Sequence, residues 1–408
     1  MENMKKIINF LILAIIFCLP GYLVRFNIFN IPTTFLEMLI YLTFVLTIYQ
    51  NISNKIKISN YLFVPMILFI AGGAIGVFIS PEKQIALGQF KACIFDPIIF
   101  LYIFISSQSD RNQIKISAIV NTLLASASLV ALHAIWQKIS GQATIDNRVV
   151  GIFGYSPNYL AMYLAPIAVF AISYLFNNYI KDKKVTFTVW FNAFAIILIM
   201  MALYFSGSRA GIGIVILCVM LNVIVLYWKQ INSNKIYQAI FYLFIICVLI
   251  GSWWMIKPNY NLSPETGGRI TASNNIRWEI WNTSMKILVT NNNWLWGVGL
   301  GNYQNYFTNF TKGWVNYDEY ISPNALTAHN VYLQTWFNLG IIGLIAFIWI
   351  IYKYFKKIDK SLIYLPLLLT MVCLLLYGLV DTIYWKNDLS IFFWLLLALP
   401  IIYKENNA

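Results

Sequence analysis

Long apolar runs separated by short polar connections dominate this chain of 408 residues. A transmembrane helix needs about 20 consecutive, mostly apolar residues. Because backbone polar groups in lipid must be satisfied within the chain, such runs form helices. The pattern predicts about twelve spans, at residues 7–24, 33–50, 59–80, 92–106, 114–136, 158–180, 185–206, 208–228, 236–256, 328–352, 361–380 and 389–403.

One large polar segment, residues 257–327, interrupts this pattern. It separates an N-terminal bundle of about nine spans, residues 1–256, from a C-terminal bundle of about three spans, residues 328–408. We expect the three parts to form one integrated domain.

The polar segment has a helical pattern of its own. Trp278, Trp281, Met285 and Leu288 recur at spacings typical of one helix face, so we predict an amphipathic helix that lies on the membrane surface or on the bundle. The glycine-rich stretch WLWGVGLGNY that follows predicts a turn. The aromatic residues of 302–327 suit either stacking on sugar rings or an interfacial aromatic belt.

The composition agrees with a membrane protein. Charged residues make up 11% of the chain, against about 25% in a soluble domain. The mean hydropathy is +0.69. The predicted fold class is therefore an all-α polytopic membrane protein with one large extracytoplasmic loop that carries an amphipathic helix.

The net charge of +13 follows topology and does not indicate nucleic-acid binding. When the connections are numbered alternately, sixteen Lys and Arg residues fall in one set and seven in the short connections of the other. Short cytoplasmic loops carry the basic excess. Both termini are therefore predicted to be cytoplasmic, with the loop of 257–327 on the outer side.

Ionisable residues within membrane spans cost free energy, and here most of them lie at the outer ends of the predicted spans. A proton-driven transporter is expected to place ionisable groups near the midplane, which is almost empty here. The distribution favours chemistry or recognition at the outer face. Within the first outer turn, we expect Arg25 to pair with Glu37.

Arg209 and Arg277 are candidates for binding an anion. Arg209 opens a span in SGSRAG, where free backbone N–H groups and flanking glycines favour a phosphate. A guanidinium adds bidentate hydrogen bonds. The alternatives are a snorkelling interfacial arginine for Arg209 and a solvated surface residue for Arg277.

His329 stands where the loop meets the next span. It is one of two histidines, and a neutral imidazole can take a proton from a hydroxyl. Asp381 is a candidate to orient the ring or hold an acceptor, although a helix cap is the alternative, and Asp388 is the second candidate acid. Further candidates for acceptor or loop contacts are Asn330 and Tyr303. A satisfied structural histidine is the alternative for His329.

The outer side of the predicted topology has no paired acid, histidine or cysteine motif that is typical of a metal site. We therefore expect metal-independent chemistry and no cofactor.

An ordered set of motifs resembles a known family. SGSRAG, IRWEIW, GVGLGNY, AHNVYLQ and DTIYWKND follow one another in the order of the O-antigen ligase and O-antigen polymerase superfamily. The resemblance extends over most of the chain.

This resemblance implies a membrane glycosyltransferase of the bacterial cytoplasmic membrane. Its donor would be a glycan on undecaprenyl diphosphate, and its partners a glycan or glycolipid acceptor and membrane lipids. Arg209 and Arg277 would hold the diphosphate, His329 would act as base, and Asp381, or else Asp388, would be the functional acid. A single displacement would invert the anomeric centre. A ligase is favoured over a polymerase that joins lipid-linked repeat units, and a lipid-linked glycan flippase is the alternative from another class.

Overall fold

The structure is a computed structural model in which almost every ordered segment is helical. It describes residues 2–29, 31–51, 60–108, 113–144, 146–154, 156–182, 186–233, 235, 273–312, 325–359 and 361–405. The predicted span 236–256 and the loop parts 257–272 and 313–324 lie outside these residues. Six described helical segments are long and apolar enough to cross a membrane: Lys83–Ser107, Ile116–Ile139, Pro157–Asn178, Phe187–Phe205, Arg209–Trp228 and Val331–Lys357.

Shorter apolar helices account for other predicted spans. They cover Phe35–Asn51, Phe63–Ile79, Leu362–Gly378 and Asn387–Pro400. The helical membrane fold is therefore confirmed, whereas the total of twelve spans stays a prediction.

The helices fall in chain order as follows. The first group is α1 Glu2–Phe17, α2 Phe35–Asn51, α3 Phe63–Ile79, α4 Lys83–Phe90, α5 Asp96–Ser107, α6 Ile116–Ile139, α7 Pro157–Asp182, α8 Phe187–Phe205 and α9 Arg209–Ser233. The second is α11 Ser273–Val289, α12 Asn293–Trp296, α13 Tyr303–Thr311, α14 Val331–Lys357, α15 Leu365–Gly378 and α16 Asn387–Glu405. A π-helical turn, Lys91–Phe95, joins α4 to α5.

A small β-hairpin departs from the predicted all-helical class. Strands β1 (Arg25–Ile28) and β2 (Ile31–Thr34) pair antiparallel, with Arg25 opposite Thr34. The hairpin lies where a simple outer turn was expected. Its two strands satisfy each other's backbone groups, which a four-residue helix cannot do as well.

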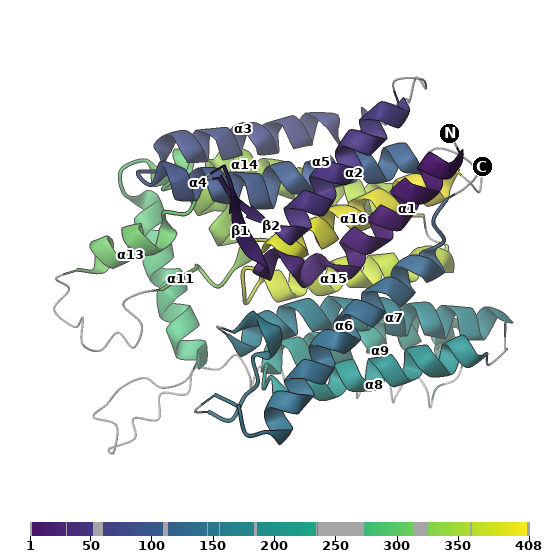
Figure 1. Ribbon diagram of the computed structural model, residues 1–408. Helices are drawn as coiled ribbons and strands as arrows, with labels where there is room; N and C mark the ends of the chain where they lie inside the picture. The colour runs from purple at the N-terminus through teal and green to yellow at the C-terminus, as the bar shows by residue number, and fades with distance from the viewer. Residues whose placement is uncertain are drawn as a thin grey trace, which may run out of the picture.

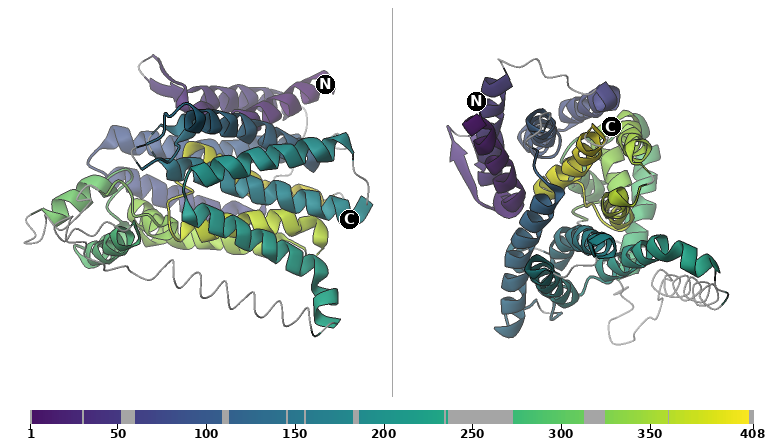
Figure 2. Two further views of the ribbon diagram at one scale, coloured as in Figure 1. Left: turned by 90° about the horizontal axis from the view of Figure 1, so that it is seen from below. Right: turned by 90° about the vertical axis from the view of Figure 1, so that its right-hand side faces the viewer.

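The long helices run side by side, and both termini lie at one end of the bundle (Figure 1). At the opposite end, hereafter the loop end, lie α4, α11, α13 and the hairpin. The views of Figure 2 agree that α6–α9 form one side of the molecule, and α14–α16 lie between α7–α9 and α3–α5, whereas α1 packs directly on α6. Helix α15 packs on α7, α14 packs on α3, and α16 packs on α5.

The glycine-rich stretch forms the predicted turn, and it inserts among the membrane helices. Helix α14 is broken at Gly340, whose φ of 65° leaves the carbonyl of Phe337 without its helical partner. The N–H of Val298 donates to that carbonyl at 2.8 Å, and the N–H of Leu300 donates to Gly76 of α3 at 3.0 Å. The turn thereby fixes the loop end of α14 against α3.

The predicted helix of the loop exists as α11, and the predicted stripe is divided between its exposed and buried faces. Trp278 and Met285 are about half exposed, at 51% and 48%. The buried face carries Ile280, Thr283, Ser284, Ile287 and Leu288. The small hydroxyl residues allow close packing, and Ser284 Oγ lies 2.9 Å from the Tyr303 hydroxyl of α13. The apolar stripe therefore predicted the helix, and the small hydroxyl residues complete the face that packs on α13.

Candidate active site

His329 and Asp381 form the centre of the loop end. The imidazole Nδ1 lies 3.5 Å from Asp381 Oδ1, and the side chains are 31% and 4% exposed. Nδ1 has no hydrogen-bond partner among the described residues, so its attraction to the carboxylate is electrostatic. Catalytic hydrogen bonds are often long in ligand-free structures and shorten when substrate binds.

Two helices, α11 and α14, hold the backbone around His329 in place. The indole Nε1 of Trp281 in α11 donates to the carbonyls of Ala328 and His329 at 3.1 and 3.3 Å. Gln334 Oε1 accepts from the N–H of Ala328 at 2.9 Å. His329 has a φ of 44°, a conformation that costs free energy in a non-glycine residue. Such strain persists where the surrounding structure enforces it, often at functional sites.

The Asp381 carboxylate keeps its charge despite burial. Burial raises its pKa, but the interaction with His329, the N–H of Thr382 at 2.8 Å and the charge of Arg277 bring the pKa below its usual value. Asp381 is therefore ionised at neutral pH and loses its charge only below the ordinary carboxyl range. An anionic partner at Nδ1 favours the imidazole tautomer whose Nε2 is free to accept a proton.

Of the two predicted arginines, Arg277 acts on this pair, and the residue before Arg209 contacts a neighbour of Asp381. The charge of Arg277 acts on both Asp381 and Tyr377. The Tyr377 hydroxyl lies 2.9 Å from Ser208 Oγ, directly before Arg209 at the first position of α9. Arg209 is exposed and Arg277 is half-buried. A chain of contacts thus connects the start of α9 with His329.

The other predicted residues have different surroundings. Asn330 caps α14, since its Oδ1 accepts from the N–H groups of Tyr332 and Leu333, and its Nδ2 donates to Leu379. The Tyr303 hydroxyl is engaged with Ser284.

Of the two candidate acids, Asp381 is the one in ion-pair distance of His329. Asp388 lies in the first turn of α16 and is 2% exposed.

A protein-family model matches the segment of the chain that contains both arginines and the histidine. Residues 194–348 match the O-antigen ligase family. The predicted resemblance is thereby confirmed, and Arg209, Arg277 and His329 all lie within the O-antigen ligase match, which ends before Asp381. The match and the apolar helices support an integral membrane glycosyltransferase of the ligase or polymerase type. A comparison with curated proteins finds no match.

Two further basic residues, Arg148 and Lys386, were not among the predicted site residues. Arg148 contacts the segment before Arg209, and the charge of Lys386 interacts with that of Asp381. Arg148 Nε donates to the carbonyl of Ser206 at 2.7 Å, which lies in the matched segment. Lys386 lies over the ring of Tyr159, and burial lowers its pKa to about 8, although the charges of Asp388 and Asp381 oppose this. Both residues belong to the basic residues of the short outer connections, and no sequence motif distinguishes them there.

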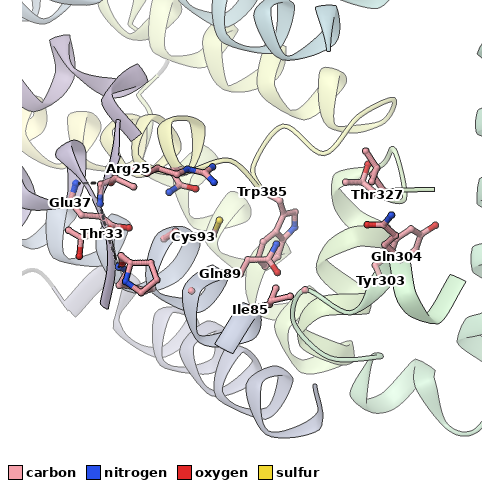
Figure 3. A pocket seen from close by; sticks show the side chains of 18 of the residues that line it. Arg25, Thr33, Glu37, Ile85, Gln89, Cys93, Tyr303, Gln304, Thr327 and Trp385 are labelled. Carbon is pink, nitrogen blue, oxygen red and sulfur yellow. Dashed lines mark hydrogen bonds and ion pairs between the residues drawn. The ribbon is translucent and has the colours of Figure 1, made fainter. Parts of the chain in front are cut away.

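A pocket of about 760 Å³ lies beside the hairpin at the loop end (Figure 3). The hairpin forms one wall, α4 and the π turn another, and α13 with residues 326–327 a third. In Figure 3, Trp385 lies between the hairpin residues and the group of Tyr303, Gln304 and Thr327.

An ion pair on the pocket wall corrects the expected pairing of Arg25 with Glu37. Glu37 Oε2 instead lies 2.9 Å from Lys91 Nζ. The same oxygen accepts from the N–H of Thr34 at 3.0 Å, and Thr34 Oγ1 accepts from the N–H of Glu37 at 3.2 Å. This reciprocal pair is a capping box at the start of α2. The TFLE stretch carried that signal in the sequence.

No cluster of three or more His, Cys, Asp or Glu side chains suited to a metal occurs within the described residues.

Proposed function

We propose that this protein transfers a glycan from undecaprenyl diphosphate to an acceptor hydroxyl at the outer face of the bacterial cytoplasmic membrane, as a ligase of the O-antigen type. The observation that carries the proposal is the His329–Asp381 pair at 3.5 Å, with Arg277 acting on the same carboxylate. In this orientation both termini are cytoplasmic and the loop end faces outward.

The proposed reaction is a single displacement. His329 Nε2 takes the proton from the acceptor hydroxyl. At the same time, the oxygen of that hydroxyl forms a bond to the anomeric carbon of the donor glycan. The bond between that carbon and the phosphate oxygen breaks, and its electron pair leaves with undecaprenyl diphosphate. Attack opposite the leaving group inverts the anomeric centre. The ionised Asp381 orients the ring and stabilises the imidazolium that forms.

Arg209 and Arg277 would stabilise the leaving diphosphate. Guanidinium groups match phosphate oxygens in bidentate geometry. Arg209 also stands at the start of α9, where unpaired backbone N–H groups favour an anion. These charges would neutralise the diphosphate in the role that a divalent ion plays elsewhere, so the proposed reaction is metal-independent.

Deletion of the gene in its own host tests the proposal and its alternatives. Loss of a ligase leaves long polymers on undecaprenyl diphosphate and bare acceptors. Loss of a polymerase leaves acceptors with at most one repeat unit. Loss of a flippase leaves single lipid-linked units on the cytoplasmic side. We expect the first outcome, and either of the others would replace the ligase assignment.

A further inference from the structure

The pocket beside the hairpin has the chemistry of a sugar-binding site. Its polar lining is largely neutral, with amides and hydroxyls from Asn27, Thr33, Gln89, Gln304, Thr327 and Asn387. Precisely placed neutral polar groups beside aromatic rings suit a ligand rich in hydroxyls. Its volume of about 760 Å³ falls in the range of small-molecule sites, about 300–1,000 Å³.

The charged groups of the pocket are mostly compensated. Lys91 and Glu37 neutralise each other at 2.9 Å, which leaves Arg25 at the hairpin edge as the remaining positive charge. Among the described lining residues, the pocket therefore has one uncompensated cation, whereas a diphosphate is best held by paired cations. In addition, Gln89 Oε1 is a buried acceptor with no hydrogen-bond partner among the described residues. A buried acceptor of this kind is suited to a donor from a ligand hydroxyl.

The pocket is bounded by the same two chain segments that carry the His329–Asp381 pair. Thr327 precedes His329 by two residues, and Gln334 both lines the pocket and bonds to Ala328. Trp385 follows Asp381 in the link between α15 and α16. A ligand in the pocket would thus lie beside the segments that carry the proposed base and its acid, although neither His329 nor Asp381 lines the pocket itself.

The hairpin wall of the pocket and the start of α9 lie on different sides of α14–α16. Arg209 begins α9, on the side formed by α6–α9. The hairpin and α4 lie on the other side of α14–α16 (Figures 1 and 2). In a single displacement the nucleophile approaches opposite the leaving group. The side away from Arg209 is therefore the side from which an acceptor would approach.

We propose that this pocket binds a sugar residue of the acceptor glycan and presents its hydroxyl to His329. This inference rests on the proposed transfer reaction and adds the acceptor site to it. Gln89 on α4 and Gln304 on α13 hydrogen-bond the sugar hydroxyls from two walls. Trp385 forms the base of the pocket between them.

The test uses the full-length protein purified in detergent. Gln89→Ala and Gln304→Ala each remove one proposed sugar contact. Gln84→Ala on α4 and Asn305→Ala on α13 are matched controls, since both residues are exposed and neither lines the pocket. The loss of one neutral hydrogen bond should raise the acceptor KM about threefold to tenfold. The donor KM and kcat should stay within about twofold, and the controls should resemble the unmodified protein.

Binding is measured separately from transfer, so that the two proposals fail independently. The probe is the oligosaccharide released by mild acid from the host's acceptor glycolipid. His329→Ala should bind this probe as the unmodified protein does but should not transfer to it. Gln89→Ala and Gln304→Ala should bind it more weakly.

Three results overturn the acceptor site. The first is a rise in the donor KM alone, which would assign the pocket to the donor glycan. The second is unchanged binding and kinetics in both pocket variants. The third is an unmodified protein that does not bind the probe. Binding without transfer in the unmodified protein would instead refute the proposed function and retain the pocket as a sugar site.

Discussion

Two carboxylates at the loop end each face a basic side chain, and the pairs differ in how completely their groups are satisfied. Glu37 and Lys91 are 5% and 25% exposed and 2.9 Å apart. Asp381 and His329 are 4% and 31% exposed and 3.5 Å apart. Burial and charge alone therefore do not separate them.

The surroundings of the two pairs show different roles. Glu37 completes a capping box with Thr34, and Lys91 Nζ also donates to the carbonyl of Pro32 at 2.7 Å, so each group completes local backbone structure. His329 instead has a strained backbone that α11 and α14 hold in place. We infer that the first pair stabilises the fold and that the second is held for chemistry.

The largest expected effect comes from removing the base. His329→Ala should reduce glycan transfer about 10²- to 10⁴-fold, the usual contribution of general base catalysis. The protein should remain folded and inserted, as size-exclusion chromatography and thermal unfolding in detergent would show. Transfer at near-normal rate would remove His329 from the mechanism.

Asp381→Asn should reduce kcat by up to about 10⁴-fold, because an amide at Nδ1 neither holds the reactive tautomer nor stabilises the imidazolium. The matched variant is Asp388→Asn, which alters a buried acid outside the ion pair. A greater loss of kcat in Asp388→Asn than in Asp381→Asn would show that Asp388 is the functional acid.

Arg209→Lys should raise the donor KM about tenfold, because lysine retains the charge but loses the bidentate hydrogen bonds to phosphate. The measurement is the rate of transfer at varied concentrations of lipid-linked donor. If arginine and lysine were equivalent here, a snorkelling or surface role would explain Arg209 better than diphosphate binding.

Glu37→Gln should act mainly on stability. Glutamine retains an oxygen that can accept from the N–H of Thr34, so the variant loses the ion pair and keeps the cap. This loss should cost about 1 kcal/mol and lower the melting temperature, and a loosened hairpin wall should raise the acceptor KM. The control is Asp146→Asn, since Asp146 is 61% exposed in its pair with Arg148 and should change the melting temperature little. A loss of kcat at unchanged stability in Glu37→Gln would contradict the assignment of a structural role to the Glu37–Lys91 pair.

The smallest expected effect is that of chelation. EDTA should leave the rate of transfer unchanged, because the proposed mechanism needs no metal ion. In it, Asp381 orients His329, and the two arginines neutralise the diphosphate. Loss of activity that is restored by a divalent ion would show that a carboxylate of the loop end binds metal instead.

Several features of this protein were predictable from local sequence. The apolar runs predicted helices, because lipid leaves the backbone no other partners. The loop helix α11 and the glycine turn were recognisable from spacing and composition. His329 and Arg209 were recognisable because titratable groups at the ends of apolar runs are costly. Each of these signals lies within a few residues of the feature that it predicts.

Pairings between distant segments were decided only by the tertiary structure. Glu37 pairs with Lys91 rather than with Arg25, and Asp381 rather than Asp388 faces His329, because helix packing determines which side chains meet. The buried face of α11 depends on the small residues that fit against α13, and the pocket exists only where the hairpin, α4 and α13 converge. These features arise from contacts between residues far apart in the chain, and periodicity along a single segment contains no information about them.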